Sequence, residues 1–145
     1  MNHSGNCFIF TLFILACYLV TPSLSFCGIG LRRPWNVSIN NFVPGDIVVH
    51  ITSTDHDLGN HTISSNGKYY WTFCEKLFGR SKFTGNFRWG SKFQTLALFD
   101  REIVDICEFD ISSDQVCHWI VNPDGFFVSG TNDPFPKGWA KKKTW

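Results

Sequence analysis

Residues 83–99, with the sequence FTGNFRWGSKFQTLALF, indicate the fold most directly. The first half alternates apolar and polar residues from Phe83 to Trp89, and Gly85 occupies one of the apolar positions. After Gly90-Ser91, the second half continues the alternation on Phe93, Thr95, Ala97 and Phe99. A period of two residues is typical of a β-strand that buries one face. The stretch therefore predicts a β-hairpin.

The length of the hairpin loop decides which side chains share a face. A two-residue loop would place Trp89 opposite Lys92, whereas a loop of odd length would place Trp89 opposite Phe93 and Phe83 opposite Phe99. A slip of one residue moves every side chain to the other face of the sheet. Because the odd register keeps the aromatic residues together, we predict a loop of three or five residues.

Similar short alternating segments occupy most of the remaining chain, and none has the pattern of a helix of normal length. Turn residues separate them, as at Ser65-Asn-Gly67 and at Asn122-Pro-Asp-Gly125. The predicted strands cover residues 35–39, 47–51, 69–73, 83–89, 93–99, 103–109, 116–121 and 126–128. The sequence thus predicts an all-β fold, an antiparallel β-sandwich of about seven to eight strands.

The N-terminus has the pattern of a targeting segment. Residues 7–20 are apolar apart from Thr11, and Ser23 and Ser25 stand where signal peptidase requires small residues. We predict a signal peptide over residues 1–25 and one mature domain over residues 26–145. The protein is then secreted and not inserted in a membrane; a membrane anchor is the alternative reading of the same segment.

Length and composition indicate one domain and argue against nucleic acid as a partner. The chain has 145 residues, a formal charge of +1, fifteen Phe and six Trp. This length fits one domain with one core. The near-zero charge argues against nucleic acid as an electrostatic partner.

Four cysteines remain after the predicted cleavage, namely Cys27, Cys74, Cys107 and Cys117. In a secreted protein an even number indicates disulfides, and three connectivities are possible. No CxxC pair is present, so a structural zinc is not indicated. Two sequons, which begin at Asn36 and Asn60, are candidate N-glycosylation sites.

Residues 50–63, HITSTDHDLGNHTI, contain three histidines, two aspartates and several hydroxyl groups. Their spacing matches no metal motif, and no strained nucleophile turn of the G-x-S-x-G type occurs in the chain. We favour an exposed interstrand loop in which Asp55 and Asp57 accept bonds from backbone N–H groups and Gly59 takes a positive φ. The protein is accordingly predicted to have no enzyme activity, no metal and no cofactor.

Several segments, in order, resemble one family, the plant self-incompatibility S1 proteins or S-protein homologues. Each segment is weakly specific alone, and their order and spacing together carry the resemblance. They are WNVSINN at 35–41, STDHDLG at 53–59, YWTF at 70–73, FG at 78–79, 83–89, Cys107, CHWIV at 117–121 and DG at 124–125.

The departures from the family pattern are informative. Where the family has two cysteines that form its first disulfide, this chain has Ile51 and Gly85. The alternation places both on the core face, so we predict that they lie side by side in the core, within about 7 Å between Cα atoms. The resemblance also implies a second disulfide, Cys107–Cys117. It offers no counterpart for Cys27 and Cys74, whose pairing stays open.

The resemblance implies a small recognition protein that binds a cell-surface receptor, in reproduction or development. We also predict that the protein is a monomer. Exposure favours three contact loops, residues 55–61, 76–82 and 110–115. The candidate contact residues are Asp55, His56, Asp57, His61, Lys76, Arg80, Lys82 and Asp114.

The alternative function is a carbohydrate or cell-wall binding module, in which exposed aromatic rings stack on sugars. Trp139 and Trp145 are the two tryptophans expected to be exposed, beside a solvated basic tail at residues 141–143. The four remaining tryptophans fall in alternating strands, which predicts that they belong to the core. They are Trp35, Trp71, Trp89 and Trp119.

Overall fold

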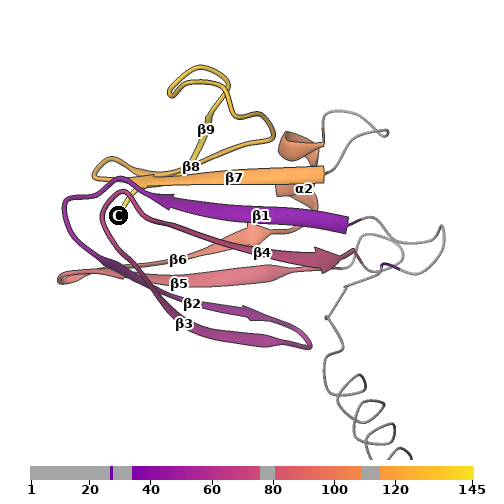
Figure 1. Ribbon diagram of the computed structural model, residues 1–145, viewed down its shortest axis with the longest axis horizontal. Coiled ribbons are helices and arrows are strands. Elements are labelled where there is room, and N and C mark those ends of the chain that lie inside the picture. Colours follow the sequence, from indigo (N-terminus) through magenta and orange to yellow (C-terminus); the bar gives the residue numbers. More distant parts are fainter. Residues whose placement is uncertain (1–26, 28–33, 76–80, 109–114) are drawn as a thin grey trace, which may run out of the picture.

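A computed structural model of the chain describes residues 27, 34–75, 81–108 and 115–145. These residues form two stacked sheets and one short helix (Figure 1). The predicted signal peptide lies outside the described residues. The elements are β1 (Pro34–Asn41), β2 (Ile47–Ser53), β3 (Asp57–Ile63), β4 (Lys68–Cys74), β5 (Phe83–Trp89), β6 (Lys92–Phe99), α2 (Arg101–Cys107), β7 (Gln115–Asn122), β8 (Gly125–Ser129) and β9 (Ala140–Lys143).

The β-sandwich architecture is confirmed, with one more strand than the upper prediction. One sheet has the strand order β4-β1-β7-β8-β9, and the other has the order β3-β2-β5-β6. The inner faces hold the predicted alternating side chains. Trp35, Val37 and Ile39 of β1 are fully buried, as are Ile47 and Val49 of β2. Burial of these apolar faces is the main source of stability.

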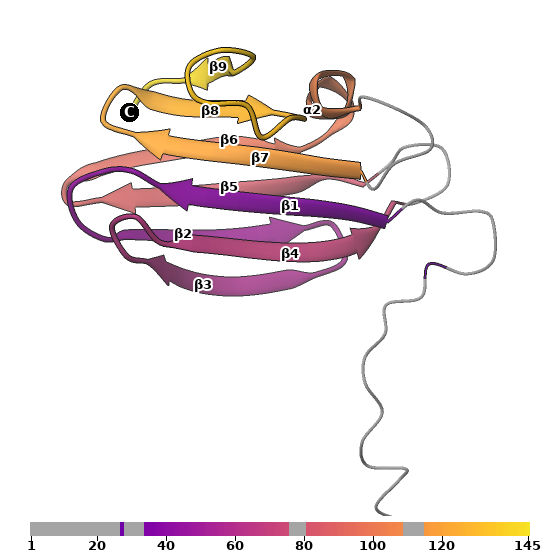
Figure 2. The ribbon, with the colours of Figure 1, turned by 45° about the horizontal axis from the view of Figure 1, so that its top comes forward.

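One pair of strands in the five-stranded sheet is parallel, so the sheets are not purely antiparallel. Strand β7 runs beside β1 in the same direction, with Val37 opposite Cys117. The reason is the position of α2, which occupies the end of the sandwich where β6 ends and β1 begins (Figure 2). The chain therefore enters β7 from the same end as β1.

The predicted length of the β5–β6 loop, three or five residues, is wrong. The two strands are joined by Gly90 and Ser91 alone, and Trp89 lies opposite Lys92. Gly90 has a φ of 57°. Glycine at the first central position suits a type II′ turn, whose twist matches that of the flanking strands.

A β-bulge changes the register farther along the same hairpin. The pairing shifts between Phe83 and Thr84, so Phe83 lies opposite Phe99, as the odd register had predicted. Between the turn and the bulge, β6 keeps the register that the two-residue loop sets. Leu96 is therefore buried in this part of the strand, whereas Phe93 is 58% exposed. One inserted residue thus reconciles a two-residue turn with an aromatic pair at the far end.

Residues 103–109 were predicted as a strand, and this is also wrong: residues 103–107 lie in α2, and residue 109 lies outside the described residues. Asp100 caps the helix, because its Oδ1 accepts a bond of 3.0 Å from the backbone N–H of Ile103. Ile103 and Cys107, four residues apart, are both buried, which is the spacing of one helix face. No helix in the described part of the chain is long and apolar enough to cross a membrane.

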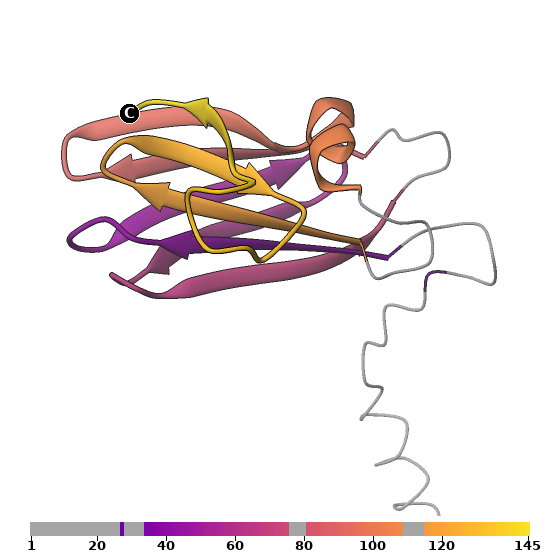
Figure 3. The same cartoon turned by 90° about the horizontal axis from the view of Figure 1, so that it is seen from above.

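The C-terminal lysines are not part of a free tail, although Lys141 and Lys143 are exposed as expected. Residues 140–143 form β9 on β8, and Lys143 Nζ donates to the carbonyl of Thr95 at 3.0 Å. Lys142 forms an ion pair with Glu102. The C-terminus lies at the end of the sandwich opposite to α2 (Figure 3).

Neither C-terminal tryptophan is fully exposed, contrary to the prediction. Trp145 is half-buried, and its ring lies 5.5 Å from that of Trp89 and 4.7 Å from that of Phe126. Trp139 is half-buried as well. Trp89, which was predicted to belong to the core, is only half-buried at the rim of this cluster.

The predicted neighbours Ile51 and Gly85 are direct cross-strand partners on β2 and β5. Both are buried, so this prediction is confirmed. A Cβ placed on Gly85 would lie 2.6 Å from Phe87 Cε2 and 2.7 Å from Leu98 Cδ1. The side chains of Phe87 and Leu98 therefore occupy the space beside Gly85.

Candidate functional site

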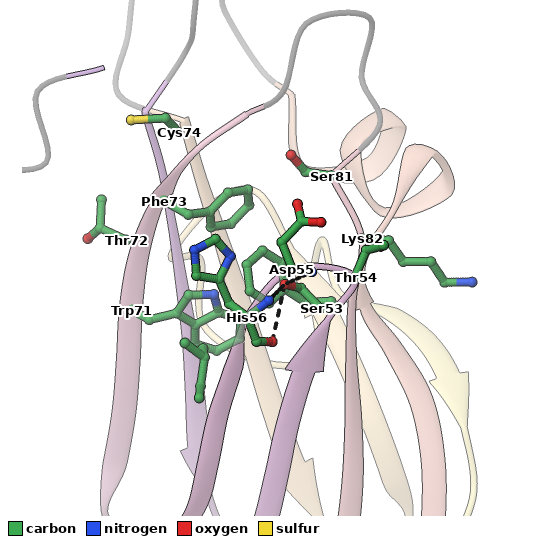
Figure 4. A pocket seen from close by; sticks show the side chains of 12 residues that line it. Ser53, Thr54, Asp55, His56, Trp71, Thr72, Phe73, Cys74, Ser81 and Lys82 are labelled. Atoms are coloured by element: carbon green, nitrogen blue, oxygen red, sulfur yellow. Dashed lines mark hydrogen bonds between the residues drawn. The ribbon is translucent and has the colours of Figure 1, made fainter. Parts of the chain in front are cut away.

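The histidine-rich stretch forms a hairpin with a short turn, and most of the expected loop is strand. Strand β2 ends at Ser53 and β3 begins at Asp57, which leaves residues 54–56 as the turn. The hydroxyl of Ser53 accepts from the N–H of His56 at 3.0 Å and donates to its carbonyl at 3.2 Å (Figure 4). This hydroxyl is thus bound to backbone groups and not to an imidazole.

Asp57 has the backbone role that the sequence predicted. Its Oδ1 accepts from the N–H of Gly59 at 2.8 Å, and Gly59 has a φ of 81°. The same oxygen lies 2.8 Å from Nε2 of His50. The bond from Gly59 first, and then that from His50, lowers the pKa of Asp57 below its ordinary value.

The three histidines of this stretch do not converge on one point. His50 binds Asp57, whereas His61 stacks on Tyr69 at 3.8 Å and bonds through Nε2 to the carbonyl of Leu58 at 2.8 Å. His56 is exposed in the turn. Among the described residues no group of three potential ligands is placed to hold a metal ion.

A second serine–histidine contact lies on the outer face of the five-stranded sheet. Ser38 Oγ and His118 Nδ1 are 3.0 Å apart. Burial, with a further contribution from Lys68, lowers the pKa of His118 and so favours the neutral ring. Ser38 is only 4% exposed, which leaves its hydroxyl little access to a substrate.

A pocket of about 340 Å³ opens at the end of the sandwich beside the turn at residues 54–56 (Figure 4). Trp71 and Phe83 form its buried wall, and the half-buried Leu58 and Phe73 extend that wall. The exposed lining residues are polar. They are Thr54, Asp55, His56, Thr72 and Lys82. The pocket therefore combines an aromatic interior with a polar mouth, as ligand sites commonly do.

A disulfide borders the pocket. Cys74, at the end of β4, lines it and is joined to Cys27, with a Cα–Cα distance of 5.4 Å. The sequence had left this pairing open. A second disulfide joins Cys107 of α2 to Cys117 of β7 across a Cα–Cα distance of 5.4 Å, the pairing that the resemblance implied.

The structure brings together only some of the predicted contact residues. Asp55, His56 and Lys82 surround the pocket, whereas Asp57 and His61 lie along β3. Lys76, Arg80 and Asp114 lie outside the described residues. The aromatic wall was missed because Trp71, Phe73 and Phe83 show the alternation of core residues, and Trp71 and Phe83 do belong to the core.

The two sequons lie in different surroundings. Asn60 is exposed on β3, at the edge of the four-stranded sheet. Asn36 is half-buried on β1, between β4 and β7, and its Oδ1 accepts a bond of 2.7 Å from Thr72 Oγ1. Asn60 is thus the more accessible of the two in the folded protein.

Comparisons with known proteins agree with one another. Residues 36–145 match the profile of the family described as plant self-incompatibility protein S1. S-protein homolog 5 of Arabidopsis thaliana is 28% identical over 96 residues, which cover 61% of this chain and 75% of that protein.

A solved structure has a similar fold. It is of self-incompatibility protein homologue (SPH) proteins, described as a widespread family of small, highly stable, secreted proteins from plants. The match covers 71% of this chain and 90% of that chain, with a TM-score of 0.51 and 14% identity. At this identity the similarity concerns the fold alone.

Proposed function

Since the chain belongs to the plant self-incompatibility protein S1 family, we propose that it is a small secreted recognition protein that binds a cell-surface receptor and catalyses no reaction. The observation that carries this proposal is the pocket with a polar, exposed mouth at one end of a β-sandwich. The reproductive or developmental role follows from the family and is part of the proposal.

Secretion is supported by two observations. The related SPH proteins are described as secreted. The four cysteines outside residues 1–25 are joined in two disulfides, which persist in oxidising compartments. We therefore retain residues 1–25 as a signal peptide that is cleaved before residue 26.

The pocket end is the better candidate for the receptor surface. At the opposite end, Trp145 packs on Trp89 and Phe126, and its Nε1 donates to the carbonyl of Asn122 at 2.8 Å. That end is closed by its own side chains. At the pocket end, buried aromatic walls surrounded by exposed polar residues have the composition of a binding hot spot.

Glycosylation fits the same arrangement. We propose that Asn60 carries an N-glycan, because its side chain is exposed on the edge strand β3 and lies away from the pocket mouth. A glycan at this edge also hinders pairing of β3 with another chain. Peptide mapping with and without a glycosidase tests this assignment.

The carbohydrate-binding alternative has weaker support in the structure. It relied on Trp139 and Trp145 as exposed stacking surfaces, and both are half-buried. Each also donates its indole N–H to a backbone carbonyl, Trp139 to Asp133 at 2.9 Å and Trp145 to Asn122 at 2.8 Å.

Binding of the labelled, processed protein to plant plasma membrane tests the receptor proposal. We expect saturable binding that Thr54→Arg combined with His56→Glu weakens at least tenfold, because both residues line the mouth. Ser64→Arg, on an exposed position at the opposite end of β3, is the matched control and should bind normally. Non-saturable binding, or equal loss in both variants, would contradict the proposal.

A further inference from the structure

One of the six tryptophans differs from the other five in the hydrogen bonding of its indole N–H. Five of them donate the indole N–H to a protein oxygen at 2.8 to 3.3 Å. The acceptors are Glu75 for Trp35, Pro44 for Trp89, Leu98 for Trp119, Asp133 for Trp139 and Asn122 for Trp145. The Nε1 of Trp71 is buried and has no hydrogen-bond partner among the described residues.

An unpaired buried donor is unfavourable. Leaving such a group without an acceptor costs about 1–3 kcal/mol, and indole N–H groups in proteins usually find a partner when they are buried. The side chain of Trp71 is only 7% exposed, so bulk water does not solvate it freely. None of the described residues supplies this acceptor, so a molecule that binds beside Trp71 would gain a hydrogen bond by supplying it.

The location of Trp71 shows where this acceptor enters. Trp71 lines the pocket, and its indole nitrogen lies on the side of the ring that faces His56 (Figure 4). Around it the wall is apolar, formed by Leu58, Phe73 and Phe83. The unpaired donor thus lies in a largely aromatic wall, and because its nitrogen has almost no exposed surface, a ligand reaches it only when the exposed side chain of His56 moves.

We propose that the pocket binds a ring-sized apolar group with one neutral acceptor oxygen, such as a phenol, and that this oxygen accepts the N–H of Trp71. The proposal rests on the proposed function in one respect, because a tyrosine side chain of the receptor is one source of a phenol. A small phenolic compound is the other source, and it needs no receptor.

The composition of the wall selects this chemistry over others. A carboxylate would lose its hydration against Phe73 and Phe83 for one bond from Trp71, and an ammonium group has no acceptor to offer that donor. A sugar ring would bring several hydroxyl groups to a wall that offers one unpaired donor. A phenol buries its ring against the aromatic side chains and places its single oxygen at the donor. The volume of about 340 Å³ is near the lower limit for ligand pockets, which suits one ring.

The direct test observes the six indole N–H signals of the ¹⁵N-labelled processed protein during titration. The probes are N-acetyl-tyrosinamide, p-cresol, N-acetyl-phenylalaninamide and methyl glucoside. We expect the two phenols to shift the Trp71 signal selectively and N-acetyl-tyrosinamide to bind about two- to tenfold more tightly than N-acetyl-phenylalaninamide, the ratio that one net hydrogen bond provides. Tighter binding of p-cresol than of N-acetyl-tyrosinamide identifies a small phenol as the ligand, and the reverse order identifies a peptide.

Two variants separate the hydrogen bond from the pocket. Trp71→Phe removes the donor and keeps an aromatic ring, so the tyrosine and phenylalanine probes should bind equally. Because Trp71 belongs to the core, Thr54→Trp is the second variant: it fills the mouth from an exposed turn and should abolish binding of both phenols. Ser64→Trp, at the other end of the sandwich, is its control.

Three results would overturn the inference. One is contact of the Trp71 N–H with water alone and no shift with any probe. The second is equal affinity of the parent protein for the tyrosine and phenylalanine probes. The third is binding of the phenols that Thr54→Trp leaves unchanged. All are independent of the membrane-binding assay, so the pocket chemistry and the receptor proposal can fail separately.

Discussion

Replacement of Gly85 by alanine tests how tightly the core is packed around the pair of Ile51 and Gly85. Gly85 lies opposite Ile51, and the added methyl group would lie 2.6 Å from Phe87 Cε2 and 2.7 Å from Leu98 Cδ1. Neither neighbour can move aside easily, because both are fully buried. Phe87 also packs edge-to-face on Phe126 at 4.9 Å.

The expected magnitude follows from two opposing effects. Forcing a methyl group into a packed core costs about 1–3 kcal/mol. Replacing glycine by alanine within a strand returns about 0.5–1 kcal/mol, since the unfolded chain loses freedom. The difference of the two midpoints predicts that Gly85→Ala lowers the free energy of unfolding by about 1 kcal/mol.

Denaturant unfolding followed by tryptophan fluorescence measures this loss, and a double-mutant cycle with Leu98→Ala identifies its cause. Leu98→Ala alone should cost about 2–5 kcal/mol. In the double variant the contact with Leu98 is gone and only that with Phe87 remains, so the combined loss should be smaller than the sum by at least 0.5 kcal/mol. Thr84→Ala, one residue away and half-buried, controls for general effects on β5. A Gly85→Ala protein as stable as the parent, or strictly additive losses, would refute the reasoning.

Three further predictions concern other elements. Replacing Cys27 and Cys74 by serine opens a loop with a sequence separation of 47 and should lower the free energy of unfolding by about 4 kcal/mol. Denaturant unfolding measures the loss, and a value below 1 kcal/mol would contradict the loop-entropy argument. Asp57→Asn should destabilise the protein at neutral pH, because the folded-state pKa of Asp57 is lowered, and the difference should shrink as pH falls from the unfolded value of about 3.9 through the folded-state pKa. Thermal unfolding at pH 7 and pH 2 measures it, and an undiminished difference at pH 2 counts against the argument. Asp100→Ala should lower the free energy of unfolding by about 1 kcal/mol and Asp100→Ser should restore it, and equal damage in both variants argues against helix capping.

The buried faces of the strands could be predicted from sequence because a period of two residues needs no long-range information. Val37 and Ile39 are buried as the alternation required, and so is the pair Ile51 and Gly85. The loop length at Gly90 could not be predicted in the same way. The register of the hairpin changes at a bulge near Phe83, and no local pattern marks a bulge.

The helix α2 was missed for a different reason. Its apolar residues are too few to distinguish a helix from a strand by periodicity. Ile103 and Cys107 are spaced by one helical turn, and Asp100 is a favourable cap, but both signals are short. The pocket was missed because Trp71 and Phe83 alternate like the core, and only the three-dimensional arrangement shows that they border an opening.

The distribution of cross-links suggests why the pocket end can serve recognition. Cys27–Cys74 ends β4 beside the pocket, and Cys107–Cys117 joins α2 to the start of β7 at the same end of the sandwich. The opposite end is closed by short turns and by the ring of Trp145 on Phe126. The two disulfides thus stabilise the pocket end of the sandwich, where the exposed turn at residues 54–56 buries little apolar surface. Substitutions in that turn should consequently change binding with little effect on stability, which is the property that a variable recognition surface requires.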